Sequence, residues 1–432
     1  MINFNDTENF LKAHSSNEIK PGLERISALL TALDNPQNGR SSFHIVGTNG
    51  KGSTGAYITS ILQASGYTTA FYSSPHLTSP GERLLINGMP LTPEEWLNAL
   101  KIAAEKISVG FEPSYFELLT AAAFLLIREK NVDVEIIEAG LGGRLDATNL
   151  LQDVICTVIT SLSMDHMEFL GDTLEKIAGE KFAVVKKNVP ACFSGDPKNL
   201  IPLFKKFCDD AGAVPFTLSE NVKLENISIA QDACTFDFYT DNLEIKNVFT
   251  PLTGRFQIYN AALALSSVSR VLDRLKKITP ENILLGLKNT CWPGRFEIIS
   301  KRPLIILDGG HNFDGIRKLV NSVHDLYPHK KIGVIYTAMR DKDFRGCLEL
   351  LSDVLNPAIY FTTVPNMQRA MTPEELLNAA KNFNWRNHPR AFILPEDALN
   401  QSINDKNDVN IICGSLYLIG NVREKLVTRF QN

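Results

Sequence analysis

A glycine-rich segment, Gly-Thr-Asn-Gly-Lys-Gly-Ser at residues 47–53, has the clearest chemical potential in this sequence. An apolar run at 43–46 precedes it, and residues 54–64 have the spacing of a helix. Backbone N–H groups of such a loop bind anions where it enters a helix, and a lysine adds a point charge for phosphate. The segment therefore predicts a site for the phosphates of ATP, formed by Thr48, Asn49, Gly50, Lys51, Gly52 and Ser53.

This segment differs from the strict phosphate-loop pattern at two positions. Ile45 stands where that pattern has its first glycine, and Gly52 follows Lys51 in place of a hydroxyl residue. Ser53, one position later, is then expected to supply the hydroxyl near the phosphates. The alternative is a glycine-rich turn that carries a solvated lysine.

A carboxylate ends the β-branched run at residues 132–139, which is typical of a buried strand. Glu138 lies beside the glycines at 140–143, and ligands bind at the carboxyl ends of strands in open α/β sheets. Glu138 is therefore predicted to hold Mg²⁺ against ATP phosphates, whereas Glu135 would face the opposite side of the strand. A glutamate that caps the loop or forms a salt bridge, for instance with Arg144, is the alternative.

Further candidates lie at other strand ends and in one helix. Asp165 and His166 follow the run at 154–160, but Mg²⁺ prefers oxygen ligands and a lone histidine is more often structural. Ser74 follows another short strand, and its hydroxyl would equally well cap the next turn. Lys181 would ordinarily be a lysine on a helix surface.

The second half of the chain offers two candidate groups. Asp-Gly-Gly-His-Asn at 308–312 follows the strand-like run 304–308 and places Asp308 and His311 at its carboxyl end. A glycine turn with a helix N-cap is the alternative. Arg295 lies at the expected domain junction, from which it could reach the phosphates of a nucleotide, and a solvated linker arginine is the alternative.

The order of elements predicts an α/β protein with two domains. Alternating strand and helix runs indicate an N-terminal P-loop-type domain with a mostly parallel sheet. Alternation from about 215 to 248 predicts a small antiparallel insert, and a helix is expected at 260–275. Residues 291–295 form the best linker, before a smaller C-terminal Rossmann-like α/β domain. Helices are expected to start after Thr92, Ser114 and Thr372, and strands at 331–336, 357–362, 391–394 and 409–413.

Composition sets the broad class of protein. With 432 residues, 44% hydrophobic and 21% charged, the chain is expected to be globular, and its formal charge of −4 gives no pull toward nucleic acid or membrane. Seven cysteines without a C-x-x-C pair indicate reduced thiols. The N-terminus has no signal core, and the apolar stretch at 118–127 is too short to cross a bilayer and predicts a buried helix. We expect a cytoplasmic monomer with small-molecule partners.

Several segments together resemble the folylpolyglutamate synthase/dihydrofolate synthase family, a branch of the Mur ligase superfamily. The string Glu-Ala-Gly-Leu-Gly-Gly-Arg-Leu-Asp-Ala-Thr-Asn at 138–149 is highly specific. The other matching segments occur in the family's order along nearly the whole chain, at 47–53, 73–77, 165–166, 180–181, 293–296, 308–312 and 413–415. The resemblance implies an ATP-binding Mur-ligase-like domain at 1–292 and a C-terminal glutamate-ligase domain at 296–432.

The resemblance also implies roles for the matching residues of the first domain. Lys51 and Ser53 would bind phosphates. Ser74, Glu138 and His166 would hold Mg²⁺. The resemblance therefore favours a metal-binding role for His166, whereas chemistry alone favours a structural one.

Further roles follow from the same resemblance. Lys181 resembles the family's carbamylated lysine, which acquires a carboxylate-like end and helps to position a second metal. Asn260 and Arg295 would contact ATP, and Asp308 would bind the nucleotide. His311 would lie near the nucleotide and the incoming glutamate. The catalytic residues implied are Lys51, Lys181 and His311.

The activity implied is an ATP-dependent amide ligase that adds L-glutamate to dihydropteroate, to a folate ending in glutamate, or to both. Another Mur-superfamily ligase with a different acyl substrate, a simple P-loop kinase and a non-catalytic nucleotide-binding regulator are the alternatives. The chain departs from the family's common pattern at Gly310, Phe313 and Phe256. These departures affect the shape of the glutamate and nucleotide pockets and leave the reaction class unchanged.

Overall fold

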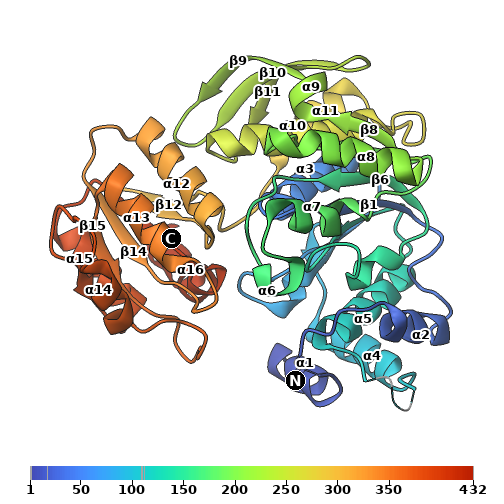
Figure 1. Cartoon of the computed structure of the whole chain (residues 1–432), viewed down its shortest axis with the longest axis horizontal. Coiled ribbons are helices and arrows are strands. Elements are labelled where there is room, and N and C mark those ends of the chain that lie inside the picture. The colour runs from blue at the N-terminus through green and yellow to red at the C-terminus, as the bar shows by residue number, and fades with distance from the viewer. Residues whose placement is uncertain (1, 17, 109, 111, 432) are drawn as a thin grey trace. The chain divides into compact units, whose positions relative to one another are not determined.

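The computed structural model describes residues 2–16, 18–108, 110 and 112–431. The chain forms two compact units, each built on its own sheet (Figure 1). The first unit contains the chain up to residue 226 together with residues 236–249 and 259–290. The second contains residues 227–235, 250–258 and the chain from residue 291 onward.

An eight-stranded sheet organises the first unit, in the order β4-β3-β2-β5-β1-β6-β7-β8. Inside it, β1 (Ser41–Val46) pairs in parallel with β5 (Val134–Glu138) and β6 (Val154–Ile159). These three strands are buried almost throughout, which explains their near-continuous apolar runs and confirms the predicted parallel sheet. The other strands are β2 (Thr69–Tyr72), β3 (Leu84–Ile86), β4 (Met89–Pro90), β7 (Pro190–Phe193) and β8 (Val214–Thr217).

Capping side chains start two long helices of this unit. Thr92 and Ser114 form the predicted capping boxes of α4 (Pro93–Ala104) and α5 (Tyr115–Lys130). The other helices along this part of the chain are α1 (Phe4–Ala13), α2 (Glu24–Ala32), α3 (Lys51–Ala64), α6 (Met167–Leu170), α7 (Leu174–Phe182), α8 (Ile201–Ala211), α9 (Leu218–Asn221), α10 (Arg255–Ser269) and α11 (Pro280–Asn289). Short 3₁₀ turns occur at Pro80–Arg83, Ala147–Leu150 and Lys198–Leu200.

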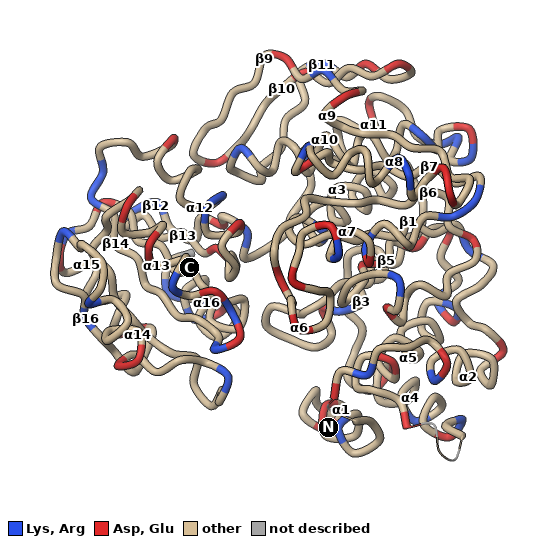
Figure 2. Tube along the Cα trace, in the orientation of Figure 1, with Lys and Arg blue, Asp and Glu red and all other residues tan. Residues whose placement is uncertain are grey.

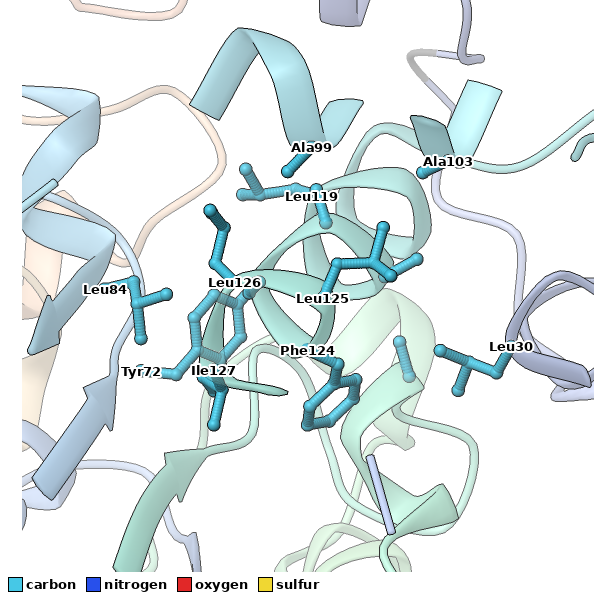
Figure 3. Packing of buried hydrophobic residues seen from close by; sticks show 14 of the residues in the cluster. Leu30, Tyr72, Leu84, Ala99, Ala103, Leu119, Phe124, Leu125, Leu126 and Ile127 are labelled. Carbon is cyan, nitrogen blue, oxygen red and sulfur yellow. The ribbon is translucent and has the colours of Figure 1, made fainter. Parts of the chain in front are cut away.

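Helix α5 runs through a hydrophobic cluster of the first unit (Figure 3). The run at 118–127 is buried in it, as predicted. Phe124 and Leu126 share this cluster with Tyr72 from β2 and Leu30 from α2. Truncating one such buried side chain costs about 2–5 kcal/mol, so the cluster fixes β2, which leads directly to Ser74.

The residue at position 55 sets how closely α3 approaches the sheet. A Cβ on Gly55 would lie 2.5 Å from the ring of Phe71 and 3.2 Å from Ile45 Cδ1. Phe71 lies in β2 and Ile45 in β1, and both side chains are buried. Helix and strands therefore meet here without a gap. The short loop after β1 leads directly into α3, so the helix starts at the carboxyl end of this strand.

The predicted bounds of two elements are wrong. The predicted insert is a three-stranded sheet of β9 (Lys223–Ile229), β10 (Cys234–Tyr239) and β11 (Glu244–Thr250), and it starts later than residue 215. Residues 214–217 instead form β8, because this short run pairs in parallel with β7 at the edge of the large sheet. Helix α10 starts five residues before the predicted residue 260 and ends at residue 269 instead of 275, since the chain enters it directly after Gly254 and turns from residue 270 onward.

The sheet of the second unit has the order β12-β13-β17-β14-β15-β16. Four predicted strands are present, as β13 (Leu304–Leu307), β14 (Ile332–Tyr336), β15 (Ala358–Phe361) and β17 (Val409–Cys413). The strand predicted at 391–394 is only β16 (Arg390–Ala391). The antiparallel edge strand β12 (Glu297–Lys301) was not predicted, because its polar ends interrupt the apolar sequence pattern that indicates a buried strand.

Within this sheet, β17 lies between β13 and β14, so the chain leaving β13 crosses β17 through α12. Ligands of open α/β sheets bind at strand carboxyl ends beside such a crossing, which is where residues 308–312 lie. Helices α12, α13 and α14 pack on one face in a common cluster. The helices are α12 (Phe313–Leu326), α13 (Phe344–Leu350), α14 (Pro373–Ala380), α15 (Pro395–Asn404) and α16 (Leu416–Gln431), with a π turn at Leu351–Leu355.

Acidic and basic residues are interspersed along the trace of each unit (Figure 2). An anionic ligand would therefore be held by local groups and not by a broad basic face. Within the described ranges, no helix combines the length and the apolar character that crossing a bilayer requires.

Candidate active site

The phosphate loop, residues 47–53, turns the chain from β1 into α3. Gly47 and Gly50 have φ values of 145° and 95°, in the left-handed region that favours glycine. A Cβ on Gly47 would lie 1.9 Å from Thr160 Oγ1, and a Cβ on Gly50 would lie 2.5 Å from Asn260 Oδ1. The loop is therefore confined between the end of β6 and α10, and Asn260, a predicted ATP contact, lies beside it.

Replacing Gly50 with alanine should destabilise the protein more than the same change at Gly39. Both glycines have left-handed φ values, 95° and 87°, so both variants carry a backbone cost of about 1–2 kcal/mol. Only Gly50 adds a clash with Asn260, whereas a Cβ on Gly39 meets no atom within 4 Å. We expect urea unfolding to show Gly50→Ala about 1–3 kcal/mol less stable than Gly39→Ala. Equal unfolding free energies would contradict the crowding described for this loop.

Two lysines converge on one carbonyl of the phosphate loop. Lys51 Nζ donates to Gly47 O at 3.2 Å and to Thr48 O at 3.3 Å. Lys181 of α7 is buried, and its Nζ donates to the same Gly47 carbonyl at 2.9 Å. Burial, and next the charge of Lys51, lowers the pKa of Lys181 to about 7. The interpretation of Lys181 as a surface lysine is therefore wrong, because the fold places it against the phosphate loop.

Glu138 lies at the end of β5, beside Ile45 of β1 in the strand register. Its side chain is buried, and its Oε1 lies 3.7 Å from Lys51 Nζ. Arg144, the alternative partner, pairs instead with Glu180 at 2.9 Å. The structure thus brings the predicted carboxylate to the phosphate-loop lysine.

Glu135 belongs to a separate polar cluster near the start of β5. Its carboxylate accepts from Ser42 Oγ at 2.5 Å and from Arg40 Nε at 3.1 Å. Burial raises the pKa of Glu135 to about 7, and the Arg40 charge opposes this rise. The prediction that Glu135 and Glu138 do not share a site is confirmed by their different partners.

The loop that follows β6 carries Asp165 and His166. Its first residues contact the phosphate loop, since Thr48 N donates to Ser161 O at 2.9 Å. Asp165 Oδ1 accepts from His166 N at 2.9 Å, and His166 precedes α6 with a left-handed φ of 52°. The fold therefore brings the segment of Asp165 and His166 to the phosphate loop, although the two segments are far apart in sequence.

The predicted Mg²⁺ ligands are Ser74, Glu138 and His166. Among the residues that the structure describes, no three side chains of His, Cys, Asp or Glu form a group that could hold a metal. The hydroxyl of Ser74, which is half-buried, and the buried Glu138 carboxylate are oxygen donors of the kind that Mg²⁺ takes together with water and phosphate oxygens. Each of these donors is of a type that suits Mg²⁺. The three-residue set stays a prediction.

In the second unit, Asp308 is buried directly after β13. Its carboxylate accepts from Phe296 N at 2.9 Å and from Gly310 N at 2.8 Å. Burial raises the pKa of Asp308, and the Arg295 charge opposes this rise. A Cβ on Gly309 would lie 2.2 Å from Arg295 Nη1, so the arginine lies against the same turn. The structure thus brings Asp308 and Arg295 together.

The residues after this turn have distinct roles. Asn312 caps α12 by accepting from Gly315 N at 2.8 Å, so the N-cap alternative applies to Asn312 and not to Asp308. His311 Nδ1 lies 2.9 Å from Gly309 O. Because a carbonyl only accepts, Nδ1 carries a proton and donates it to this bond.

The buried His44 contacts the glycine-rich loop after β5, a role that no sequence pattern indicates. His44 Nε2 lies 2.9 Å from Thr148 Oγ1, 104 residues away in sequence. Thr148 Oγ1 donates to Asp146 Oδ1 at 2.5 Å, and Asp146 also accepts from Leu141 N at 2.8 Å. Burial, and next the charge of Lys186, lowers the pKa of His44 to about 3.

Replacing His44 with glutamine should make the protein less sensitive to acid. The pKa of His44 in the folded state, about 3, lies below its ordinary value of 6.5, so its neutral form contributes stability above pH 6.5 that is lost as the pH falls toward 3. We expect urea unfolding between pH 7 and pH 4 to show a loss about 3 kcal/mol smaller for His44→Gln than for the wild type. His388→Gln, at an exposed residue, is the control. Equal acid sensitivity in all three proteins would refute the prediction.

Comparison with known families gives the class of protein. The Mur ligase middle domain matches residues 45–268, and the Mur ligase glutamate ligase domain matches residues 294–416. The first range contains the phosphate loop, Glu138 and Lys181, and the second contains Arg295 and Asp308. The fold and the site therefore define a Mur ligase.

Individual relatives narrow this class. The dihydrofolate synthase/folylpolyglutamate synthase of Bacillus subtilis is 32% identical over 98% of this chain and 99% of its own. The folylpolyglutamate synthase of Lacticaseibacillus casei is 32% identical over 93% of this chain and 94% of its own. The crystal structure of Mycobacterium tuberculosis folylpolyglutamate synthase with ADP and AMPPCP has a TM-score of 0.89 at 27% identity, covering 98% of both chains. The chain belongs to the dihydrofolate synthase/folylpolyglutamate synthase family.

Proposed function

We propose that the protein is an ATP-dependent ligase that joins L-glutamate to dihydropteroate, to a folate ending in glutamate, or to both. One observation carries the proposal: Lys51, Glu138 and Lys181 converge on the phosphate loop of a chain that matches this family over almost its whole length. The reaction would form an amide and release ADP and phosphate. Relatives named for both activities support the ligase class.

The chemistry has two steps. A carboxylate is a poor acyl donor because oxide is a poor leaving group. Transfer of the γ-phosphoryl group of ATP to the substrate carboxylate gives an acyl phosphate and ADP. The glutamate amine then attacks the acyl carbon, the bond to the phosphate oxygen breaks, and loss of a proton from nitrogen leaves the amide.

The phosphate loop would bind ATP through the N–H groups at the start of α3 and the Ser53 hydroxyl. Lys51 would move its ammonium from the Gly47 and Thr48 carbonyls onto the transferred phosphoryl group, where negative charge accumulates. Asn260, which lies beside Gly50, would contact the nucleotide from α10.

Ser74, Glu138 and His166 would hold the metal ion of this reaction. When bound, Mg²⁺ neutralises phosphate charge and polarises the transferred group. Lys181 would carry the carbamate that the family resemblance implies. A buried amine with a pKa of about 7 is neutral in a substantial fraction near that pH, and a neutral amine is the form that adds to carbon dioxide.

The second unit would supply further contacts. Arg295 and Asp308 would bind the nucleotide, and His311 would face the nucleotide and the incoming glutamate. The hydrogen bond from its Nδ1 to Gly309 O would hold the ring in place there. We assign residues 1–292 to the ATP-binding domain and residues 296–432 to the glutamate-ligase domain. The protein would act in the cytoplasm as a monomer on small molecules, without a nucleic-acid or membrane partner.

Glutamate-dependent ADP release, measured with dihydropteroate and tetrahydrofolate separately, tests this proposal. Release with dihydropteroate alone would identify a dihydrofolate synthase, and release with tetrahydrofolate alone a polyglutamylating enzyme. Release with both would identify a bifunctional protein. No release with either, in a protein that binds ATP, would overturn the proposal in favour of another acyl substrate or a regulatory role.

A further inference from the structure

Hydrogen bonds join the phosphate loop to the loop that follows β6. Thr48 N and Asn49 N donate to Ser161 O at 2.9 and 3.4 Å, and Ser161 Oγ donates to Asn49 O at 3.2 Å. Residues 49 and 161 form an antiparallel bridge. Because these two N–H groups point toward the neighbouring loop, phosphate binding depends on the N–H groups that follow them at the start of α3.

The side chain of Thr48 completes this contact. Its Oγ1 donates to Ser163 O at 3.2 Å and accepts from Ser163 N at 3.1 Å. A hydroxyl donates and accepts at the same time, whereas a methyl group of similar size does neither. Thr48 therefore binds both polar backbone groups of one residue, 115 positions away in sequence.

Ser163 lies where the second loop passes from its buried to its exposed part. Leu162 is buried, and its N–H donates to Asp196 O at 2.9 Å. His166 lies in the exposed part. The apolar side chains around it also face solvent, at Met164, Met167 and Phe169. The exposed part of the loop therefore begins directly after Ser163, three residues before His166.

We propose that Thr48 is a positioning residue, whose hydroxyl keeps the loop of Asp165 and His166 in register with the phosphate loop. The inference rests on the proposed function, in which His166 holds Mg²⁺. Thr48 would act through Ser163, and its side chain would not touch the nucleotide. This role replaces the phosphate contact predicted for Thr48. Its hydroxyl would therefore matter for binding the nucleotide with Mg²⁺ and not for binding the nucleotide alone.

Hydrogen exchange in the ligand-free protein tests the contact itself. Thr48→Val should speed exchange of the Ser163 amide by about tenfold, because that N–H loses its acceptor, while Thr48→Ser should resemble the wild type. Ser163→Ala is the matched control, since Ser163 Oγ is buried and has no hydrogen-bond partner among the described residues. Unchanged exchange across residues 161–170 in Thr48→Val would overturn the proposal.

Calorimetric titration of ADP at a series of Mg²⁺ concentrations tests the consequence. Mg²⁺ is expected to raise the affinity for ADP, and Thr48→Val should need about tenfold more Mg²⁺ than the wild type to reach half of that increase. When a chelator removes the metal, the ADP affinity of the variant should lie within about twofold of that of the wild type. An equal loss of ADP affinity with and without Mg²⁺ would show that the Thr48 side chain binds phosphate directly, and this would overturn the proposal. Unchanged ADP affinity under both conditions would overturn it as well. Thr48→Ala, which also lacks the hydroxyl, replaces the valine variant if that variant does not fold. Failure of the wild type to bind ADP would overturn the proposed function instead, because the exchange experiment needs no ligand.

Discussion

Glu138→Gln is expected to lower kcat for glutamate-dependent ADP release by about a thousandfold. Glutamine keeps the size of the side chain but removes the charge that would hold Mg²⁺. The charge also lies 3.7 Å from Lys51 Nζ, so its loss changes the field at the lysine as well. Because the side chain is buried, water does not replace the missing charge. Steady-state ADP release over a series of Mg²⁺ concentrations measures the effect.

The control for this prediction is Glu95→Gln on α4. Glu95 pairs with Lys130 at 2.6 Å, with about a third of each side chain exposed, and it lies outside the proposed site. Its loss should change the rate by less than about twofold. Near-normal activity of Glu138→Gln at limiting Mg²⁺ would remove Glu138 from the proposed metal site.

The second large effect is expected for Lys51→Met, with a loss of about a hundredfold to a thousandfold in kcat. Methionine approximates the length of the side chain without its charge, so the transferred phosphoryl group would lose the positive charge that Lys51 supplies. The affinity for ATP should also fall, because the lysine charge attracts phosphate before and during transfer. Initial rates at saturating glutamate and folate, together with calorimetry of ADP, separate the two effects.

Lys176→Met is the matched control for the lysine. Lys176 lies on α7, the helix that also carries Lys181, and pairs with Asp172 at 2.7 Å in the solvent. Its replacement should leave kcat within about twofold of the wild type. A Lys51→Met variant that keeps more than about a tenth of the wild-type kcat would contradict the role given to Lys51 in phosphoryl transfer.

The parts of the fold that sequence predicts well are those whose residues are buried on both faces. β1, β5, β6 and β17 each leave a run rich in apolar residues, and the burial of these strands explains it. The short edge strands β12 and β16 have no such run, because they exist through pairing with a neighbour that is distant in sequence. The misplaced start of the insert has the same origin, since only its pairing with β7 identifies β8.

In the candidate site, too, some residues can be predicted from local sequence and others cannot. The phosphate loop is a local pattern, and its geometry follows from glycines that lie next to each other in sequence. Lys181 reaches the Gly47 carbonyl from 134 residues away, and nothing near it in sequence indicates burial. His44 and Thr48 likewise act through partners more than a hundred residues along the chain. Resemblance to a family supplied a role for Lys181 that spacing alone could not.

The meeting of Gly55, Phe71 and Ile45 beneath α3 has a consequence for how this enzyme family can vary. A helix is stiff over a few turns, so a larger residue at 55 would displace the start of α3 together with Lys51, although no chemical group had changed. What is constrained is therefore the summed volume of three side chains on three elements, and not any one identity. Added bulk at 55 would be tolerated when position 71 or position 45 shrinks, so the three positions can change only together.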